Sequence, residues 1–386
     1  MNIILDKSTW KKVKFGSVIE SITKRIDNPS AAGVERYVGL EHLDPGSMTI
    51  TRWGIPEQVE ATKLLFSKGD VIFGRRRAYQ KKVSIADFDG ICSAHALVLR
   101  AKSGLIDPRF LPVFLSSDYF LDRAVKISVG SLSPTVNWKT LANQEFFLPP
   151  IDVQSKIADL FWKIEDHKTK LKQMNAILDN QIAPMFIKDK VTYNLGDEIL
   201  ETSLLNVGRW SSGMTPKAAS PEYYLNGIHP FVTIGDLSSE IIIDTSSYLT
   251  EAGLHHAGGL IQKGSILISM YGTIGKVAIA GVPLATSQAI ASVLVDEKIC
   301  LSRYIFYFLQ SLKKEFEHEG RGATQMNINR KMITSKVISV PTLERQAEIV
   351  LSLDLLNSQI QAVNDEILSL EKLARMILST LIEVSN

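Results

Sequence analysis

The chain has 386 residues, of which 45% are hydrophobic, and a formal net charge of +2. This length exceeds one ordinary hydrophobic core, so we expect two or three globular units. No run of about 18 apolar residues occurs, and residues 1–30 lack the apolar segment of a signal peptide, which predicts a cytoplasmic protein with no membrane partner. The two cysteines, Cys92 and Cys300, lie far apart, which argues against a disulfide framework or a metal site.

Residues 1–149 are expected to form a first globule of mixed α/β type. They contain 21 Lys and Arg against 15 Asp and Glu, which permits a polyanionic partner, although most such excesses are only solvated surface. Strand patterns are expected near residues 10–18 and at 70–73, separated by polar segments with Gly and Pro. A short apolar helix is expected near residues 109–121.

The densest positive charge in this globule follows the strand expected at residues 71–73. An Arg guanidinium binds phosphates and also reads guanine bidentately in the major groove. An exposed hairpin without a ligand has the same pattern and is the alternative interpretation. The candidate nucleic-acid contacts are Arg75, Arg76, Arg77, Tyr79, Lys81 and Lys82.

A polar loop at residues 130–137 follows, shortly before the first long helix. Ser hydroxyls suit either DNA groove and Asn suits adenine edges, but turns and helix caps use the same residues. Ser133 and Asn137 are therefore candidate base contacts, with turn formation or capping as the alternative.

Residues 150–189 are expected to form the first long helix, with Asp152 in its first turn, where a negative charge interacts favourably with the helix dipole. Its apolar residues follow the 4-3 alternation of a coiled-coil seam. Lys168 and Asn175 interrupt this seam, either because they fix helix register or because they face solvent. The seam residues are Ile157, Phe161, Ile164, Leu171, Leu178 and Ile182.

Residues 190–341 repeat the first globule at a period of 192 to 195 residues. The matching segments are 68–74 (KGDVIFG) with 263–269 (KGSILIS), 109–115 (RFLPVFL) with 303–309 (RYIFYFL), 148–154 (LPPIDVQ) with 340–346 (VPTLERQ) and, faintly, 38–43 (VGLEHL) with 232–237 (VTIGDL). The second globule is therefore expected to have the same order of strands, followed by a short apolar helix near residues 301–312.

The second globule also has candidate contacts in two loops, at residues 270–276 (MYGTIGK) and 321–329. Two glycines let the first loop approach another surface closely, and its Thr and Lys suit a phosphate, although a tight hairpin without a ligand explains it nearly as well. The second loop is rich in amides, and Gln288 is a weaker candidate of the same kind. The candidates are Tyr271, Thr273, Lys276, Gln288, Arg321, Gln325 and Asn327.

Residues 342–386 are expected to form a second long helix with the same 4-3 seam. Two similar globules separated by two matching helices imply a pseudo-two-fold symmetric α+β fold. If the helices pair as an antiparallel coiled coil, the globules lie at opposite ends of a rigid rod. The seam residues of this helix are Leu353, Leu356, Ile360, Val363, Ile367, Leu370 and Ile377.

The motifs of the enzymes that act on DNA or ATP are missing from the sequence. Adenine methylation needs an Asn-Pro-Pro-aromatic motif, but Asn28-Pro29 is followed by Ser30 and Ala31. A Walker loop needs a Lys that reaches the phosphates, but the closest glycine spacing, at residues 208–213, is followed by Met and Thr. We therefore expect no active site, no metal and no cofactor bound by this chain.

The duplicated strand that begins at Lys68 and Lys263, the turn YGTIGK at 271–276 and the helix entries PPIDVQ and PTLERQ resemble the specificity subunits of type I restriction-modification systems. The resemblance spans essentially the full length. It implies two target recognition domains, residues 1–149 and 190–341, which each read one half of a split double-stranded DNA site. One departure is the first-half segment FGRRRAY at 73–79, which replaces the Gly-Thr-Ile-Gly type of turn.

The resemblance also implies partners for the two helices. Residues 150–189 and 342–386 would be spacer helices that contact two methyltransferase subunits, and restriction subunits with translocase activity would join this core. S-adenosylmethionine, ATP and Mg²⁺ would be bound by those partners. A stand-alone DNA-binding regulator and a heptad-rich scaffold protein are the alternatives. The regulator would need no partner enzyme, and the scaffold protein would not bind duplex DNA.

Overall fold

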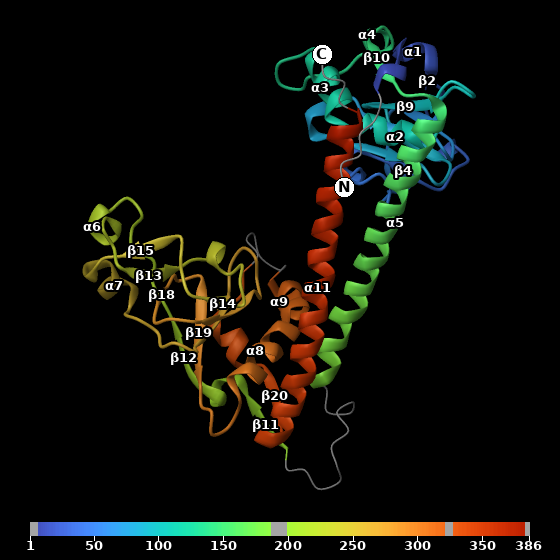
Figure 1. Cartoon of the computed structure of the whole chain (residues 1–386). Coiled ribbons are helices and arrows are strands. Elements are labelled where there is room, and N and C mark those ends of the chain that lie inside the picture. The colour runs from blue at the N-terminus through green and yellow to red at the C-terminus, as the bar shows by residue number, and fades with distance from the viewer. Residues whose placement is uncertain (1–6, 187–198, 321–326, 383–386) are drawn as a thin grey trace. The chain divides into compact units, whose positions relative to one another are not determined.

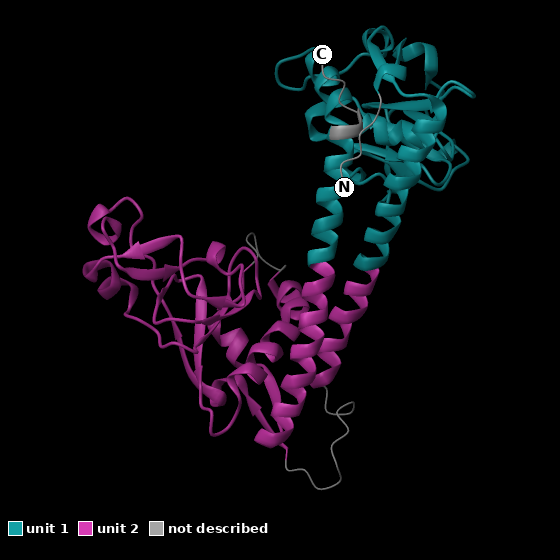
Figure 2. Cartoon of the chain, viewed as in Figure 1, with its two compact units in different colours: residues 1–172, 365–386 teal, residues 173–364 magenta. Residues whose placement is uncertain are grey.

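The computed structural model describes residues 7–186, 199–320 and 327–382 (Figure 1). The chain divides into two compact units, residues 1–172 with 365–386 and residues 173–364 (Figure 2). Each unit contains one globule of helices and strands and a segment of each long helix. The expected mixed α+β class is confirmed. In the described part of the chain, no helix is long and apolar enough to cross a membrane.

The globule of the first unit contains two four-stranded sheets and a two-stranded ribbon. The first sheet is antiparallel and has the order β2 (Ile19–Ile22), β9 (Ala96–Ala101), β6 (Val71–Gly74) and β7 (Val83–Ile85). The second has the order β3 (Arg25–Ile26), β5 (Lys63–Phe66), β8 (Gly90–Ser93) and β4 (Tyr37–Val38). The ribbon joins β1 (Lys11–Lys14) to β10 (Glu145–Leu148), directly before the first long helix.

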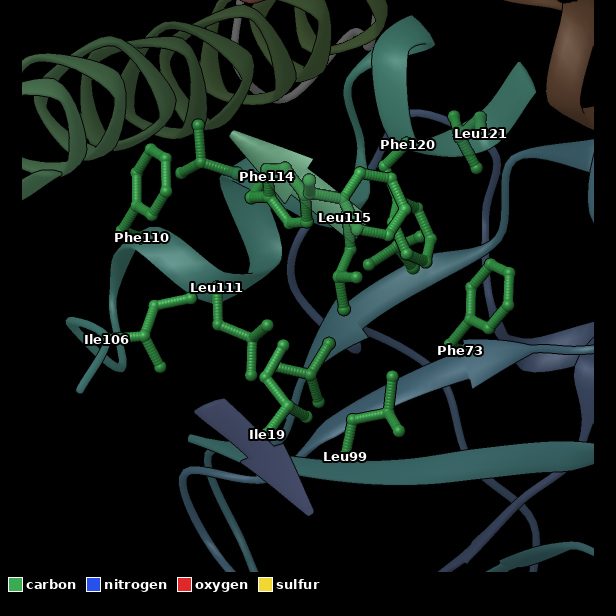
Figure 3. Packing of buried hydrophobic residues seen from close by; sticks show 14 of the residues in the cluster. Ile19, Phe73, Leu99, Ile106, Phe110, Leu111, Phe114, Leu115, Phe120 and Leu121 are labelled. Atoms are coloured by element: carbon green, nitrogen blue, oxygen red, sulfur yellow. The ribbon is translucent and has the colours of Figure 1, made fainter. Parts of the chain in front are cut away.

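Short helices pack on the first sheet of this globule. All residues of α2 (Phe110–Leu115) are buried, and Figure 3 shows Leu111 and Leu115 pointing toward the strands. Full burial of one such side chain stabilises the fold by about 1.5–3 kcal/mol. The apolar segment expected near 109–121 is broken into two helices because Ser117 caps α3 (Asp118–Lys126), its side chain accepting a bond from the Phe120 N–H at 3.3 Å. The helices are α1 (Phe15–Val18), α2 (Phe110–Leu115), α3 (Asp118–Lys126) and α4 (Trp138–Ala142).

The globule of the second unit repeats this plan. Its five-stranded sheet has the order β12 (Gly208–Ser212), β19 (Ile290–Val295), β16 (Ile266–Ser269), β17 (Val277–Ala280) and β14 (Ile241–Ile242). A three-stranded sheet has the order β15 (Ser247–Leu249), β13 (His229–Val232) and β18 (Ala285–Thr286), and β11 (Leu200–Ser203) pairs with β20 (Val337–Val340). The helices are α6 (Pro221–Tyr224), α7 (Glu251–Ala257), α8 (Ser302–Ser311), α9 (Lys313–Glu319) and α10 (Arg330–Thr334).

The repeat is closer in the large sheets than in the small ones. The order β2-β9-β6-β7 returns as β12-β19-β16-β17. The small sheets differ in strand order. In the first globule β5 pairs with β8, whereas in the second globule β15, the counterpart of β5, pairs with β13. The parallel pair β4–β8 nevertheless has a counterpart in the parallel pair β13–β18. The two globules therefore share the strand ends that form the sites described below.

The long helices are α5 (Ile151–Ile182) and α11 (Leu343–Ile382), and each contributes a segment to both units. In the first unit, Ile157 and Phe161 from the start of α5 share a core with Ala374 and Ile377 from the end of α11. In the second unit the roles reverse, and the end of α5 packs with the start of α11 around Leu353. The helix segments of each unit therefore pair antiparallel, as expected from the heptads.

The polar residues of the seam lie in the helix interface. Lys168 is only 7% exposed, and its Nζ lies 2.8 Å from Glu165 Oε1. The side-chain amide of Asn175 donates to Asn364 Oδ1 across the helices at 2.7 Å. Asn175 therefore bonds across the pair of helices, as a register-fixing residue does, whereas the ion pair of Lys168 stays within α5 and does not bear on register.

Candidate nucleic-acid interface

Several loops of the first globule meet at one edge. Because β4 and β8 are parallel, with Val38 opposite Cys92, their carboxyl ends point to the same side. The last residue of β6, Gly74, pairs with Ala96, directly after the turn that follows β8. This arrangement places the turn at 93–95 beside the loop at 75–82. We call residues 39–42, 75–82, 93–95 and 129–137 the first loop edge.

The two candidate segments of the first globule contact each other at this edge. The Arg77 N–H donates to the Pro134 carbonyl at 2.7 Å, and the Val136 N–H donates to the Arg75 carbonyl at 2.9 Å. The Arg76 guanidinium also donates to the Ser133 hydroxyl at 3.2 Å. Residues far apart in sequence are therefore held together by backbone pairing, which gives the arginine-rich loop a defined position.

The cationic side chains of this loop differ in whether they already bond to other groups of the protein. Lys81 pairs with Asp118 at 2.6 Å, and Lys82 donates to the carbonyl of Leu40. Arg75 is half-buried, and its Nε has no partner among the described residues. Arg77 is exposed at φ 56°, and nothing in the described segments bonds its guanidinium.

Two further candidates of the first loop edge are also open to solvent. Tyr79 follows the arginines and is 53% exposed. Asn137 precedes α4 and is exposed, but its side chain makes no capping bond there. Arg77, Tyr79 and Asn137 are therefore the side chains of this edge that are most available to a ligand.

The second globule has a matching edge. The strands β13 and β18 are parallel, with Val232 opposite Thr286, and their ends lie beside the loop that follows β16. Tyr271 pairs with Asn327 in an isolated bridge, and the Met270 N–H donates to the Ala289 carbonyl at 2.8 Å. We call residues 233–239, 270–276, 287–289 and 327–329 the second loop edge.

The candidates of the second globule are not all in the same position. Tyr271, Thr273, Gln288 and Asn327 are exposed on the second loop edge. Lys276, the last residue of segment 270–276 in this edge, instead lines a cleft of about 740 Å³ beside α9 and the long helices. The remaining candidates, Arg321 and Gln325, lie outside the described residues.

Backbone geometry accounts for the glycines at 272 and 275. Both have positive φ, 64° and 76°, which side chains with a Cβ rarely adopt. The buried Ser269 closes this turn, because its hydroxyl donates to the Thr273 carbonyl and accepts from the Lys276 N–H at 2.9 Å. Two hydrogen bonds of Ser269 therefore hold the backbone of this turn, and the Thr273 side chain is exposed on it.

Two residues of the loop edges were not among the sequence candidates. The Nδ1 atom of His42 accepts from the Gly39 N–H at 3.0 Å, directly after β4. In the second globule, Asp236 accepts from the N–H and hydroxyl of Thr233, both at 2.8 Å. Burial alone would raise the pKa of Asp236, but hydrogen bonds from Thr233 and Ser246 lower it. The faint match of 38–43 with 232–237 was the sequence signal for this pair.

Metal binding and thiol chemistry have little support in the described part of the chain. No group of three His, Cys, Asp or Glu residues there is placed to hold a metal ion. Cys92 and Cys300 are buried free thiols, and burial raises the pKa of both to about 12. A thiolate is the reactive form of cysteine, so both behave as small core residues.

Comparison with known proteins identifies the family. The chain matches the model of the type I restriction modification DNA specificity domain twice, over residues 7–178 and 200–372. The chain belongs to this family. It is a specificity subunit of a type I restriction-modification system, with two recognition domains.

Relatives of this specificity subunit match it over most of its length. A putative type I restriction enzyme MjaX specificity subunit from Methanocaldococcus jannaschii is 21% identical and aligns over 89% of this chain and 85% of its own. The solved type I S subunit from M. genitalium is 16% identical, with a TM-score of 0.59 over 98% and 97% of the two chains. A chain from a structural study of type I R-M complex assembly is 21% identical, with a TM-score of 0.60 over 97% and 98%. These two structures share its fold.

Proposed function

We propose that this specificity subunit reads a bipartite double-stranded DNA sequence, one half with each loop edge. Residues 1–149 and 190–341 are the two recognition domains, and residues 150–189 and 342–386 are the spacer helices. The observation that carries this proposal is the convergence of equivalent strand ends and loops at one edge of each globule. Exposed Arg, Tyr, Gln and Asn side chains at these edges suit phosphates and base edges.

The proposed contacts differ between the two domains. In the first, the exposed guanidinium of Arg77 is proposed to bind a phosphate or a guanine edge, and Tyr79 adds an exposed ring. Arg75, Arg76, Lys81, Lys82, Ser133 and Asn137 surround them. In the second, Gln288 and Asn327 are proposed to read bases, and Thr273 and Tyr271 to contact the backbone. The FGRRRAY loop therefore makes the first interface more strongly cationic than the second.

We further propose that two methyltransferase subunits dock on the long helices and that restriction subunits join them. The seam side chains from Ile157 to Ile377 are largely buried within the chain, so a partner must use other apolar residues. Leu351 and Leu355 of α11, at 63% and 61% exposure, and Ile177 of α5 are available for this contact. In this proposal the chain does no catalysis, and S-adenosylmethionine, ATP and Mg²⁺ bind to the partners.

Co-expression with a type I methyltransferase subunit tests this proposal. We expect a stable complex on size-exclusion chromatography that methylates a split DNA sequence. Sequence-specific DNA binding by a chain that forms no such complex would favour a stand-alone regulator. Failure to bind duplex DNA in either form would favour a scaffold protein.

A further inference from the structure

Arg303, at the start of α8, binds two carboxylates on different elements. Its Nη1 lies 2.7 Å from Glu240 Oε1, and its Nε lies 2.6 Å from Asp354 Oδ1 on α11. Tyr307 donates to the same Asp354 oxygen at 2.6 Å, and Asn357 donates to Glu240 Oε2 at 3.1 Å. These five side chains form one network, which we call the Arg303 network.

The Arg303 network joins the second loop edge to a long helix. Glu240 follows Asp236 by four residues, and its backbone carbonyl accepts from the Ile279 N–H of β17 at 2.7 Å. The intervening Leu237 is buried. At the other end, Asp354 and Asn357 belong to α11. A short path of bonded residues therefore leads from the loop edge through Glu240 to the helix, within the second unit.

The geometry of the Arg303 network favours a fixed position. A guanidinium that binds two carboxylates through separate nitrogens is constrained in direction as well as distance. Burial raises the pKa of Tyr307, and its bond to Asp354 raises it further, so the hydroxyl stays a donor. The charged side chains are 31–36% exposed, so they are shielded only in part and their contribution to stability is modest.

The described residues of the first unit contain no equivalent connection. Arg109, which matches Arg303 in the repeat, binds Asp159 of α5 at 2.6 Å and the nearby Asp107 at 3.4 Å. Asp107 lies two residues before Arg109 and outside the first loop edge. Within the described residues, Arg109 makes no hydrogen bond or ion pair with residues 39–46. The matching arginine thus reaches only the long helix and its own segment.

We infer that Arg303 is a positioning residue for DNA recognition: through Glu240, the residue after segment 233–239 of the second loop edge, it holds that segment at a set position on α11. It thereby determines how strictly the second half-site and its spacing are recognised. This inference rests on the proposed function. It predicts that loss of this arginine-centred network affects recognition of the second half-site but not of the first, a difference that the shared fold of the two domains does not predict.

The test uses the assembled methyltransferase complex with Glu240→Ala and the size-conserving Glu240→Gln. Both leave the contact between Arg303 and Asp354 in place. Glu222→Ala, at an exposed glutamate of α6 in the same unit, is the control. Methylation is measured on the cognate duplex and on duplexes altered in the first half-site, in the second half-site, or by one base pair in the gap.

For Glu240→Ala we expect the preference for the cognate second half-site and gap to fall about fivefold to tenfold, a size typical of coupling between linked elements. Glu240→Gln should show a smaller loss, and discrimination at the first half-site should stay unchanged. A purely structural role would lower the melting temperature or complex assembly and affect both half-sites alike, which would overturn the inference.

Two other results separate the inference from the proposed function. If the wild-type complex discriminates sequence and both Glu240 variants, folded and assembled, discriminate equally well, the inference is wrong and the proposed function stands. If the wild-type complex discriminates no sequence at all, the proposed function fails, and the inference fails with it.

Discussion

The side-chain oxygen of Gln346 accepts a hydrogen bond from the backbone N–H of Leu301 at 2.7 Å. Its amide nitrogen donates to the Pro341 carbonyl at 2.8 Å. In the first half, Gln154 makes the same pair of bonds, with the Asp107 N–H at 2.9 Å and the Pro149 carbonyl at 2.8 Å. One buried glutamine in each half thus joins the start of a long helix to the segment before a short apolar helix.

Gln346→Ala should destabilise the second unit. The change leaves buried backbone groups without partners, so we expect a loss of about 2 kcal/mol or more in the free energy of unfolding, measured by urea denaturation. The control is Gln359→Ala, on the exposed face of the same helix, which should change stability by less than about 0.5 kcal/mol. Equal effects at the two positions would contradict a structural role for Gln346.

Asp107 should make the stability of the first unit pH-dependent. Burial alone would raise its pKa, but hydrogen bonds from Ser155 and the Arg109 N–H, with the Arg109 charge, lower the pKa below its ordinary value. A carboxyl group whose pKa is lower in the folded than in the unfolded state stabilises the fold when it is ionised. This contribution is fully present at pH values above the unfolded pKa. It is lost as the pH falls through the folded pKa, because the carboxyl group is then protonated in both states. Asp107→Asn should therefore lower the melting temperature at pH 7 and flatten its decline in acid, as pH falls below the ordinary aspartate pKa of about 4.

The exposed Asp152→Asn is the control for this pH dependence. It should retain nearly the wild-type decline of melting temperature in acid. If Asp107→Asn showed the same decline as the wild type, another group would have to account for the acid sensitivity.

The long helices and the repeat could be predicted from sequence because their signals are local. Heptads identify a seam such as Leu353 to Ile377, and buried apolar runs identify α2 and α8. The contacts that build the sites are not local: Arg76 meets Ser133, and Arg303 meets Glu240. In the sequence, nothing distinguishes these four residues from other polar surface residues. Their meeting depends on strand order, which itself differs between the two small sheets.

Arg77→Ala should weaken DNA binding by the assembled complex and reduce its dependence on salt. One lost phosphate contact lowers the slope of log K against log salt by about 0.9. The control is Lys12→Ala on the β1–β10 ribbon, where the lysine pairs with Glu145 at 2.7 Å. An unchanged affinity and slope for Arg77→Ala would remove this residue from the interface.

Lengthening both spacer helices should widen the gap between half-sites. One added heptad in each of α5 and α11 preserves the seam and adds roughly 10 Å, at about 1.5 Å per residue. That length corresponds to roughly three base pairs of DNA. Four-residue insertions should be worse, because they shift the apolar stripe. Methylated sites with an unchanged gap would show that the recognition domains set the spacing.

The most direct test of separate half-site reading is to replace residues 190–341 with the corresponding domain of a relative and to map the methylated sequence. Each loop edge belongs to its own unit, so we predict that one half of the site changes and the other half is retained. A hybrid that changes both halves together, or that keeps the original site, would contradict the account.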